Sequence, residues 1–508
     1  MGYKEIILKL PTDYSDDQLR IKIEKELGIK VFSWQIKKKS LDARKKNRIH
    51  WQIQVSVLSE HIKGPIPQAA PSLDIQYRKT EEKVVVVGSG PAGFFCAFVL
   101  QKAGFNTILI ERGTEVKKRA EGIRHFEKTG EFDPISNYAF GEGGAGTFSD
   151  GKLTSRSKHI SLEREFIVAS YINAGAPEVI KYMAHPYLGS DNLKKILKVL
   201  RQQFLDIGGK VLFETFLEDI RIKEGRVSEA ITTKGVIEAD KFVIAAGHSA
   251  FETYRMLINK GVKFRTKNFA IGCRMEHPQE VINEAQWGQK SLKGVKAAEY
   301  RLTSQGAQFP VYTFCMCPGG IIVPSASYGN TNIVNGMSYY NRSGEFANAA
   351  CVAGINLESL IGKVVSPLEA LDWLENLEKK FYQFSDGFKA PFCTIQNFIN
   401  KKGTNKICET SYPLGIESAD LWNLLPSEIS NSIAEGLKDF SKKIKGFDTG
   451  NVLGLESKSS APIQVLRETD GLCEGIENLY IAGEGSGWSG GIMSSAADGI
   501  KAAMHIIK

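Results

Sequence analysis

The sequence predicts an α/β protein with three parts: a main domain built on a parallel sheet, a mixed α/β domain inserted into it, and a small N-terminal module. Three observations support this prediction. The valine run 84–87 leads directly into a Gly88-x-Gly90-x-x-Gly93 turn and a helical segment. A second apolar run, 478–482, ends in Gly483-Glu484 near the C-terminus. Between the two, residues 262–445 lose this pattern and alternate in strand-like runs.

Residues 1–75 are expected to form the N-terminal module. Alternating apolar residues predict strands at 5–10, 31–38 and 49–58, and a helical pattern covers 15–27, which together make a βαββ unit. The proline-rich stretch Gly64–Pro71 predicts a stiff linker into the main domain.

Positive charge is concentrated in this module. Residues 1–80 contain 16 Lys and Arg against 9 Asp and Glu, although the whole chain carries a net charge of only +8. The basic side chains gather in the hairpin Lys37 to Arg48, as Lys37, Lys38, Lys39, Arg44, Lys45, Lys46 and Arg48. Such a hairpin tip is suited to bind RNA, another polyanion or an acidic protein partner. The alternative is a solvated loop, because the aromatic residues expected for single-strand stacking are sparse.

The main domain begins with a dinucleotide-binding pattern at residues 83–261. The first glycine of the motif permits a tight turn, the second lets the backbone approach a pyrophosphate, and the third lets the helix pack closely on its strand. A helix is predicted at 91–103 and a strand at 107–110, after which Glu111 is expected to reach the adenosine ribose hydroxyls. The stretch from Arg119 to Gly151 is expected to form a glycine-rich loop, followed by helices at 161–173 and 191–207.

The C-terminal segment resembles that of glutathione-reductase-like flavoproteins. It runs from Asn478 through Gly483-Glu484 to Trp488-Ser489-Gly490-Gly491-Ile492 and a helix. In that family the acid, usually Asp, binds the ribityl or phosphate region, and the helix N-terminus favours negative charge on the reduced flavin. The block 239–247, ending in Gly247, resembles the middle strand of the same family. These resemblances imply FAD rather than NAD as the resident cofactor.

Further blocks resemble a bacterial family of uncharacterised FAD-dependent dehydrogenases. They lie at 140–153, 269–278, 314–320, 334–338 and 459–462. The resemblance implies a glutathione-reductase-like FAD-binding Rossmann-type domain made of residues 83–261 and 446–508, with a substrate or cap domain at 262–445. The residues expected to bind the cofactor are Gly88, Ser89, Gly90, Pro91, Ala92, Gly93, Glu111, Arg112, Gly143, Gly144, Gly146, Thr147, Gly247, Gly483, Glu484, Gly490, Gly491 and Ile492.

The function implied by these blocks is that of an FAD-dependent oxidoreductase, a dehydrogenase or reductase that moves a hydride through flavin N5, with no substrate indicated. A second βαβ unit opened by a Gly-x-Gly-x-x-Gly motif is not found, so NAD(P)H is expected at most as a transient electron donor. Two alternatives stay open: an RNA-modifying flavoprotein that docks RNA on the basic module, and a non-enzymatic flavin redox sensor or assembly factor.

Catalytic candidates are fewer than cofactor candidates. Lys152 follows the glycine-rich block and is expected to lie near the flavin as a cation. Cys315 and Cys317 are either a redox-active pair, residues lining the substrate cavity, or two buried thiols. Arg274 is suited to anchor a substrate carboxylate or to pair with Glu276 two residues on. His277 is suited to act as a general acid or base.

Composition excludes several other classes of protein. With 42% hydrophobic and 24% charged residues, the chain is typical of globular proteins with more than one domain. No apolar run approaches the length of a membrane span and no signal peptide is recognised, so a cytoplasmic location is expected. The eight cysteines form no disulfide framework, the eight histidines show no zinc-ligand spacing, and no Ser-His-Asp order suggests hydrolysis.

Overall fold

The computed structural model describes residues 1–68, 71–403, 408–468 and 471–508, and its first part is the N-terminal module. The module consists of β1 (Gly2–Leu10), α1 (Asp16–Leu27), β2 (Ser33–Asp42) and β3 (His50–Ser59). Its strands form an antiparallel sheet in the order β1-β3-β2. Ser15 caps α1 through a capping box, and alternate residues of the sheet pack with the helix into a small core of their own. The predicted βαββ unit is therefore confirmed, with β2 extending four residues beyond its expected end.

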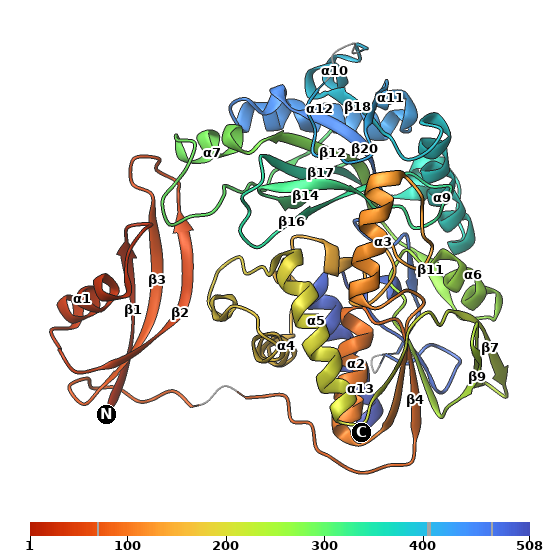
Figure 1. Ribbon diagram of the computed structural model, residues 1–508, viewed down its shortest axis with the longest axis horizontal. Helices are drawn as coiled ribbons and strands as arrows, with labels where there is room; N and C mark the ends of the chain where they lie inside the picture. Colours follow the sequence, from red (N-terminus) through yellow and green to blue (C-terminus); the bar gives the residue numbers. More distant parts are fainter. Residues whose placement is uncertain (69–70, 404–407, 469–470) are drawn as a thin grey trace.

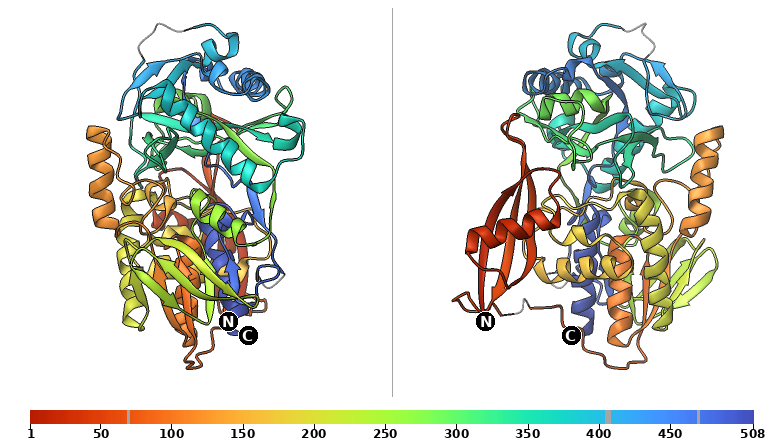
Figure 2. Two further views of the ribbon diagram at one scale, coloured as in Figure 1. Left: turned by 90° about the vertical axis from the view of Figure 1, so that its right-hand side faces the viewer. Right: turned by 60° about the vertical axis from the view of Figure 1, so that its left-hand side comes forward.

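The basic hairpin of this module lies against the rest of the protein (Figure 1). The Lys39 N–H donates to the Tyr182 carbonyl at 2.8 Å, and the Ala184 N–H donates to the Lys39 carbonyl at 2.9 Å. Ala43 packs against the core of the main body near the tip. Elsewhere the module stands beside the main domain, and the described residues of the connecting segment run along the bottom of the molecule in this view (Figure 2). Helices and strands are absent from the described residues of the predicted linker 64–71, of which residues 69 and 70 lie outside the described part.

A parallel five-stranded sheet forms the centre of the main domain. Its order is β22-β10-β4-β5-β6, so the three apolar runs that the sequence places far apart lie side by side. Val84 and Val86 point to helices α2 and α13, whereas Val85 and Val87 point to the opposite face, covered by a second, antiparallel sheet of three strands. The elements are β4 (Lys83–Val87), α2 (Pro91–Ala103), β5 (Asn106–Ile110), α4 (Ser161–Asn173), α5 (Gly189–Asp206), β6 (Lys210–Leu212), β7 (Leu217–Lys223), β8 (Arg226–Thr232), β9 (Gly235–Glu238), β10 (Lys241–Ile244), α6 (Phe251–Asn259), β22 (Leu479–Ile481) and α13 (Ile492–Ile507).

One expected loop is partly helical. Residues 116–129 form helix α3 (Val116–Thr129), which occupies the first part of the stretch Arg119 to Gly151. Its buried residues Val116, Ile123 and Phe126 recur at helical spacing, and Glu115 caps its first turn. The prediction of a glycine-rich loop was wrong for residues 119–129, because charged residues on the exposed face of α3 dilute its apolar pattern.

The inserted domain is built on a seven-stranded sheet above the first sheet (Figure 1). Its order is β13-β14-β17-β12-β20-β18-β19. Strand β20 lies within residues 446–508, which the sequence analysis assigned to the FAD-binding part, so the observed boundary falls later than 446. The elements are β11 (Phe264–Thr266), β12 (Phe269–Pro278), α7 (Gln279–Trp287), β13 (Thr303–Ser304), β14 (Val311–Cys317), β15 (Gly320–Pro324), β16 (Val334–Ser338), β17 (Phe346–Ile355), α8 (Leu357–Ile361), α9 (Pro367–Phe384), β18 (Ala390–Thr394), α10 (Ile395–Asn400), β19 (Ile416–Ser418), α11 (Leu421–Leu424), α12 (Ser427–Lys443), β20 (Asn451–Glu456) and β21 (Ile463–Val465).

The architecture is thus mixed α/β, as the sequence predicts. Across the described ranges, every helix is too short or too polar to traverse a lipid bilayer.

Candidate functional site

The glycine motif after β4 forms a tight cradle between β4 and α2. Gly88 has φ +97°, and a Cβ atom on it would lie 2.4 Å from the Ala245 carbonyl oxygen. A Cβ atom on Gly93 would lie 1.9 Å from the Gly88 carbonyl oxygen. Both positions therefore exclude any side chain, as expected for the turn and for close packing of the helix on the strand.

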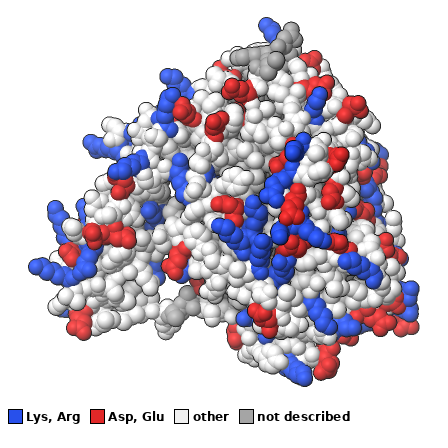
Figure 3. All heavy atoms as spheres, in the orientation of Figure 1, with Lys and Arg blue, Asp and Glu red and all other residues white. Residues whose placement is uncertain are grey.

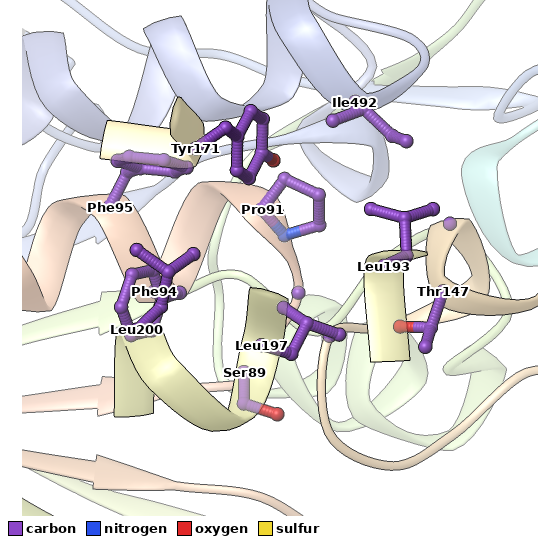
Figure 4. Close-up of a pocket in the computed structure, with 13 residues that line it drawn as sticks. Ser89, Pro91, Phe94, Phe95, Thr147, Tyr171, Leu193, Leu197, Leu200 and Ile492 are labelled. Atoms are coloured by element: carbon purple, nitrogen blue, oxygen red, sulfur yellow. The ribbon is translucent and has the colours of Figure 1, made fainter. Parts of the chain in front are cut away.

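Two helices begin at this cradle. Helix α2 starts after Gly90 and α13 starts after Gly491, and neither N-cap makes a side-chain hydrogen bond. The unpaired N–H groups at both ends favour a bound anion. Pro91 and Ile492, the first residues of the two helices, line the same pocket (Figure 4). The pocket is lined by Ser89, Gly90, Pro91, Phe94, Phe95, Gly143, Gly146, Thr147, Tyr171, Leu193, Leu197, Leu200 and Ile492.

The glycine-rich loop that covers this pocket is held by a buried arginine. Arg119, on α3, has no exposed surface and donates five hydrogen bonds of 2.8–3.2 Å to backbone carbonyls. The acceptors are the carbonyls of Asn137, Tyr138, Gly141, Glu142 and Gly144. Burial lowers the pKa of Arg119 to about 10, so it stays charged at neutral pH. Sequence reasoning missed this residue because its partners are carbonyls, which leave no signature in a sequence.

Glu111 and Arg112 lie at the end of β5 and contact the protein itself. The Glu111 carboxylate accepts hydrogen bonds from the N–H groups of Ser89, Gly113 and Gly141 at 2.8–3.0 Å, and from the Ser89 hydroxyl. Arg112 pairs with Glu252 on α6 at 2.5 Å. The ribose contact expected of Glu111 stays a prediction. In the structure this carboxylate joins the glycine turn to the glycine-rich loop.

A second acid and a histidine meet at the other side of the cradle. Glu484 follows β22, and its Oε2 lies 3.4 Å from Nδ1 of His248, the residue after Gly247. The His248 side chain is 7% exposed and the Glu484 side chain 24%. A Cβ atom on Gly490 would lie 3.7 Å from Glu484 Oε1, which places the carboxylate beside the start of α13. The sequence analysis predicted Glu484 and Gly247 but not His248, since its partner lies 236 residues away.

Lys152 lies where the glycine-rich loop meets the inserted domain. Its ammonium donates to Asp150 Oδ2 at 2.7 Å and to the Met316 carbonyl of β14. Asp150 also accepts from Arg342, at 2.7 Å to Nη2, and from the Ser338 hydroxyl. Burial opposes ionisation of Asp150, yet Lys152 and Arg342 lower its pKa to about 2. Burial likewise opposes the charge on Lys152, and Asp150 reverses that effect and raises the lysine's pKa. This contact, which we call the interdomain seam, therefore carries fixed charges at neutral pH.

Cys315 and Cys317 sit in a β-bulge of β14 at this seam. Strand pairing with β17 shifts register between Phe314 and Cys317, and Cys315 has φ +42°, the left-handed region that non-glycine residues rarely adopt. Cys315 is exposed and Cys317 is buried. Two thiols buried together are therefore not what the structure shows.

Arg274 is buried and holds the bulge through a hydrogen bond to its backbone. Its fully buried guanidinium donates to the Cys315 carbonyl at 2.7 Å and to Glu456 Oε2 at 2.7 Å. Asn348, Asn335 and the Cys317 sulfur accept the remaining bonds. The expected carboxylate anchor is thus a structural ion pair, formed with Glu456 and not with Glu276, whose carboxylate binds Ser411.

His277 lies inside the inserted domain, away from the seam. Its Nε2 donates to the Phe447 carbonyl at 2.7 Å, and burial lowers its pKa to about 4. It is therefore neutral at physiological pH and has no exposed surface. The structure argues against the acid or base role expected from the sequence.

The basic hairpin divides into docked and exposed side chains. Lys39 is turned inward onto Tyr14 and Trp51, and Arg44 pairs with Asp42 at 2.6 Å. The exposed basic side chains are Lys37, Lys38, Arg44, Lys45, Lys46 and Arg48. Figure 3 shows Lys and Arg along the outer edge of the module, interspersed with acidic residues. An RNA or acidic protein partner for these side chains stays a prediction.

Comparison with known proteins identifies three family models. A model described as an FAD binding domain matches residues 81–133. A model described as an FAD-dependent protein, C-terminal domain-like, matches residues 268–459. Residues 3–58 match a domain of unknown function. The two larger parts of the chain therefore both carry the features of FAD-dependent proteins.

Solved structures with similar folds are distant. They include CtdE in complex with FAD (11% identity, 84% of each chain, TM-score 0.37) and glycine oxidase from Bacillus cereus (12% identity, 84% of this chain and 95% of that chain, TM-score 0.34). An uncharacterized protein from Clostridium beijerinckii is 38% identical over 520 residues, covering 97% of both chains. The chain therefore belongs to the family of this Clostridium protein, a family whose domains are those of FAD-dependent proteins.

Proposed function

We propose that this protein is an FAD-dependent oxidoreductase with a glutathione-reductase-like arrangement. The observation that carries the proposal is the convergence of two glycine-capped helix N-termini, at Gly90 and Gly491, on one pocket. An FAD pyrophosphate needs N–H donors, positive dipole ends and a backbone without side chains, and this cradle offers all three.

Different residues of the chain would hold the cofactor and shape the substrate side. Arg119 holds the glycine-rich loop over the cradle, and Glu111 fixes the turn beneath it. When bound, FAD supplies hydride transfer at N5 of its ring system. Lys152 and Asp150 at the interdomain seam would place fixed charge on the substrate side, and the inserted domain would exclude water there. The sequence favours no one electron donor. NAD(P)H would have to bind without a dedicated nucleotide-binding domain.

Gly90→Ala is the variant that tests the cradle. Its Cβ atom would lie 3.7 Å from the nearest atom, Gly144 Cα, and Gly90 has φ −66°, so an alanine fits the folded protein. The new methyl group would nevertheless occupy the space expected for the pyrophosphate. We expect unchanged thermal unfolding of the apoprotein with at least tenfold weaker FAD binding, measured by quenching of FAD fluorescence. Equal FAD affinity in both proteins would contradict the proposed binding mode.

The electron donor is tested on the purified holoprotein. We expect the absorbance band of oxidised flavin, and we would follow its anaerobic bleaching as NADH or NADPH is added. Rapid bleaching would indicate a pyridine-nucleotide-dependent reductase. A protein that retains FAD but does not bleach would receive electrons from its substrate or from a protein partner.

A further inference from the structure

We infer that His248 is a positioning residue for Glu484 in the cofactor site, and that its protonation strengthens FAD binding. This inference rests on the proposed function, because it requires that FAD occupies the cradle between α2 and α13. It concerns a residue that neither the glycine motif nor the C-terminal block indicates.

The first argument comes from the charge that Glu484 brings to the site. Its carboxylate lies beside Gly490, at the N-terminus of α13, and is only partly exposed. A carboxylate there uses part of the helix's positive field, and its charge repels a pyrophosphate that would use the same field. The affinity of the site for a dianionic ligand therefore increases when the charge of this carboxylate is neutralised.

The second argument is that His248 is placed to neutralise it. Nδ1 of the imidazole lies 3.4 Å from Glu484 Oε2. The other ring nitrogen, Nε2, is buried and has no hydrogen-bond partner among the described residues. This unpaired nitrogen costs free energy in both protonation states. In the charged state, attraction to the Glu484 carboxylate offsets part of that cost.

The surroundings of the pair contain further titratable groups. Tyr254 of α6 and Lys267, which follows β11, interact electrostatically with Glu484, and Glu456 of β20 interacts with His248. Glu456 is already paired with Arg274, and Lys267 donates to the Gly487 carbonyl.

The test is the dissociation constant of FAD as a function of pH, measured on full-length apoprotein by fluorescence quenching. We expect wild-type protein to bind FAD about tenfold more tightly at pH 6 than at pH 8. His248→Asn keeps an N–H donor close to the position of Nδ1 but cannot be protonated. It should bind FAD as wild type does at pH 8 and show no gain at pH 6. Glu484→Gln should also lose the pH dependence.

The matched control is His125→Asn, which removes a histidine paired with Glu131 at 2.7 Å on the exposed surface of α3. It should retain the wild-type pH profile. A flat wild-type profile, or a His248→Asn profile with the wild-type slope, would overturn the inference while leaving the proposed function intact. Failure of wild-type protein to bind FAD at any pH would instead overturn the proposed function, and the inference with it.

Discussion

Replacement of Arg119 by methionine should loosen the glycine-rich loop and lower the stability of the FAD-bound protein. Among the described residues, the carbonyls of Gly141, Glu142 and Gly144 each accept a second hydrogen bond, from Gly144 or Thr147. Within the part of the chain that the structure describes, the carbonyls of Asn137 and Tyr138 have no other donor. Two buried carbonyls thus lose their partners, at a cost of about 1–3 kcal/mol each. Methionine carries no charge, so the variant no longer has to bury a guanidinium, and this offsets part of the loss. We therefore expect the free energy of unfolding to fall by about 3 kcal/mol in total.

The assay for this variant is the release of FAD fluorescence on heating. For a domain of this size, 3 kcal/mol corresponds to a decrease of about 6–12 °C in the release temperature. Arg119→Lys should recover part of the loss, because an ammonium group supplies three donors. Arg20→Met, which removes an exposed i,i+4 pair with Glu24, is the control and should change stability by less than about 0.5 kcal/mol. A release temperature of Arg119→Met within about 2 °C of wild type would refute the reasoning.

Three further predictions concern single side chains. The pKa of His277 is lowered from 6.5 to about 4 in the folded protein, so stability present above pH 6.5 should decrease as pH falls from 6.5 to 4, and His277→Gln should weaken that decrease in pH-dependent thermal unfolding. Cys315 is the exposed cysteine, although its protein surroundings raise its pKa to about 12; N-ethylmaleimide should therefore modify it first and faster at pH 9 than at pH 7, whereas mass mapping of modification at Cys393 first would contradict the structure. Lys152→Met should lower the flavin midpoint potential, by about 30 mV if the lysine contributes 1.4 kcal/mol to the reduced state; an unchanged potential in spectroelectrochemical titration would place the lysine out of reach of the flavin.

Local pattern was enough to predict the elements around the cradle. The strand at 84–87, the helix at 91–103 and the turn between them follow from periodicity and glycine spacing, because each depends on neighbours in the chain. The same holds for the βαββ module, whose elements follow in the predicted order. The stretch after Arg119 was predicted poorly, since its apolar residues are diluted by charged ones on the exposed face of α3.

Side-chain roles were predicted less well than elements, because they depend on contacts between distant segments. Arg274 and Glu456 are 182 residues apart, so nothing near Arg274 in the sequence indicates that its partner is a buried acid. His277 has the chemistry of a general base, yet its burial against Phe447 prevents protonation at neutral pH. The residue type indicates which chemistry each side chain is capable of. Whether that chemistry is used depends on burial, which is set by the fold.

Backbone strain at the interdomain seam supports assigning the substrate side to this contact. Cys315 has φ +42° and Arg342 has φ +51°, conformations that cost of order 1–3 kcal/mol each in non-glycine residues. Both are held by bonds that cross the seam: Lys152 binds the Met316 carbonyl next to Cys315, and Asp150 binds the Arg342 guanidinium. Asp150 and Lys152 belong to the loop that covers the cradle, so the loop and the strained bulge are mechanically joined. The loop over the cradle and the bulge that presents Cys315 therefore share direct contacts, as expected if the substrate binds at the seam.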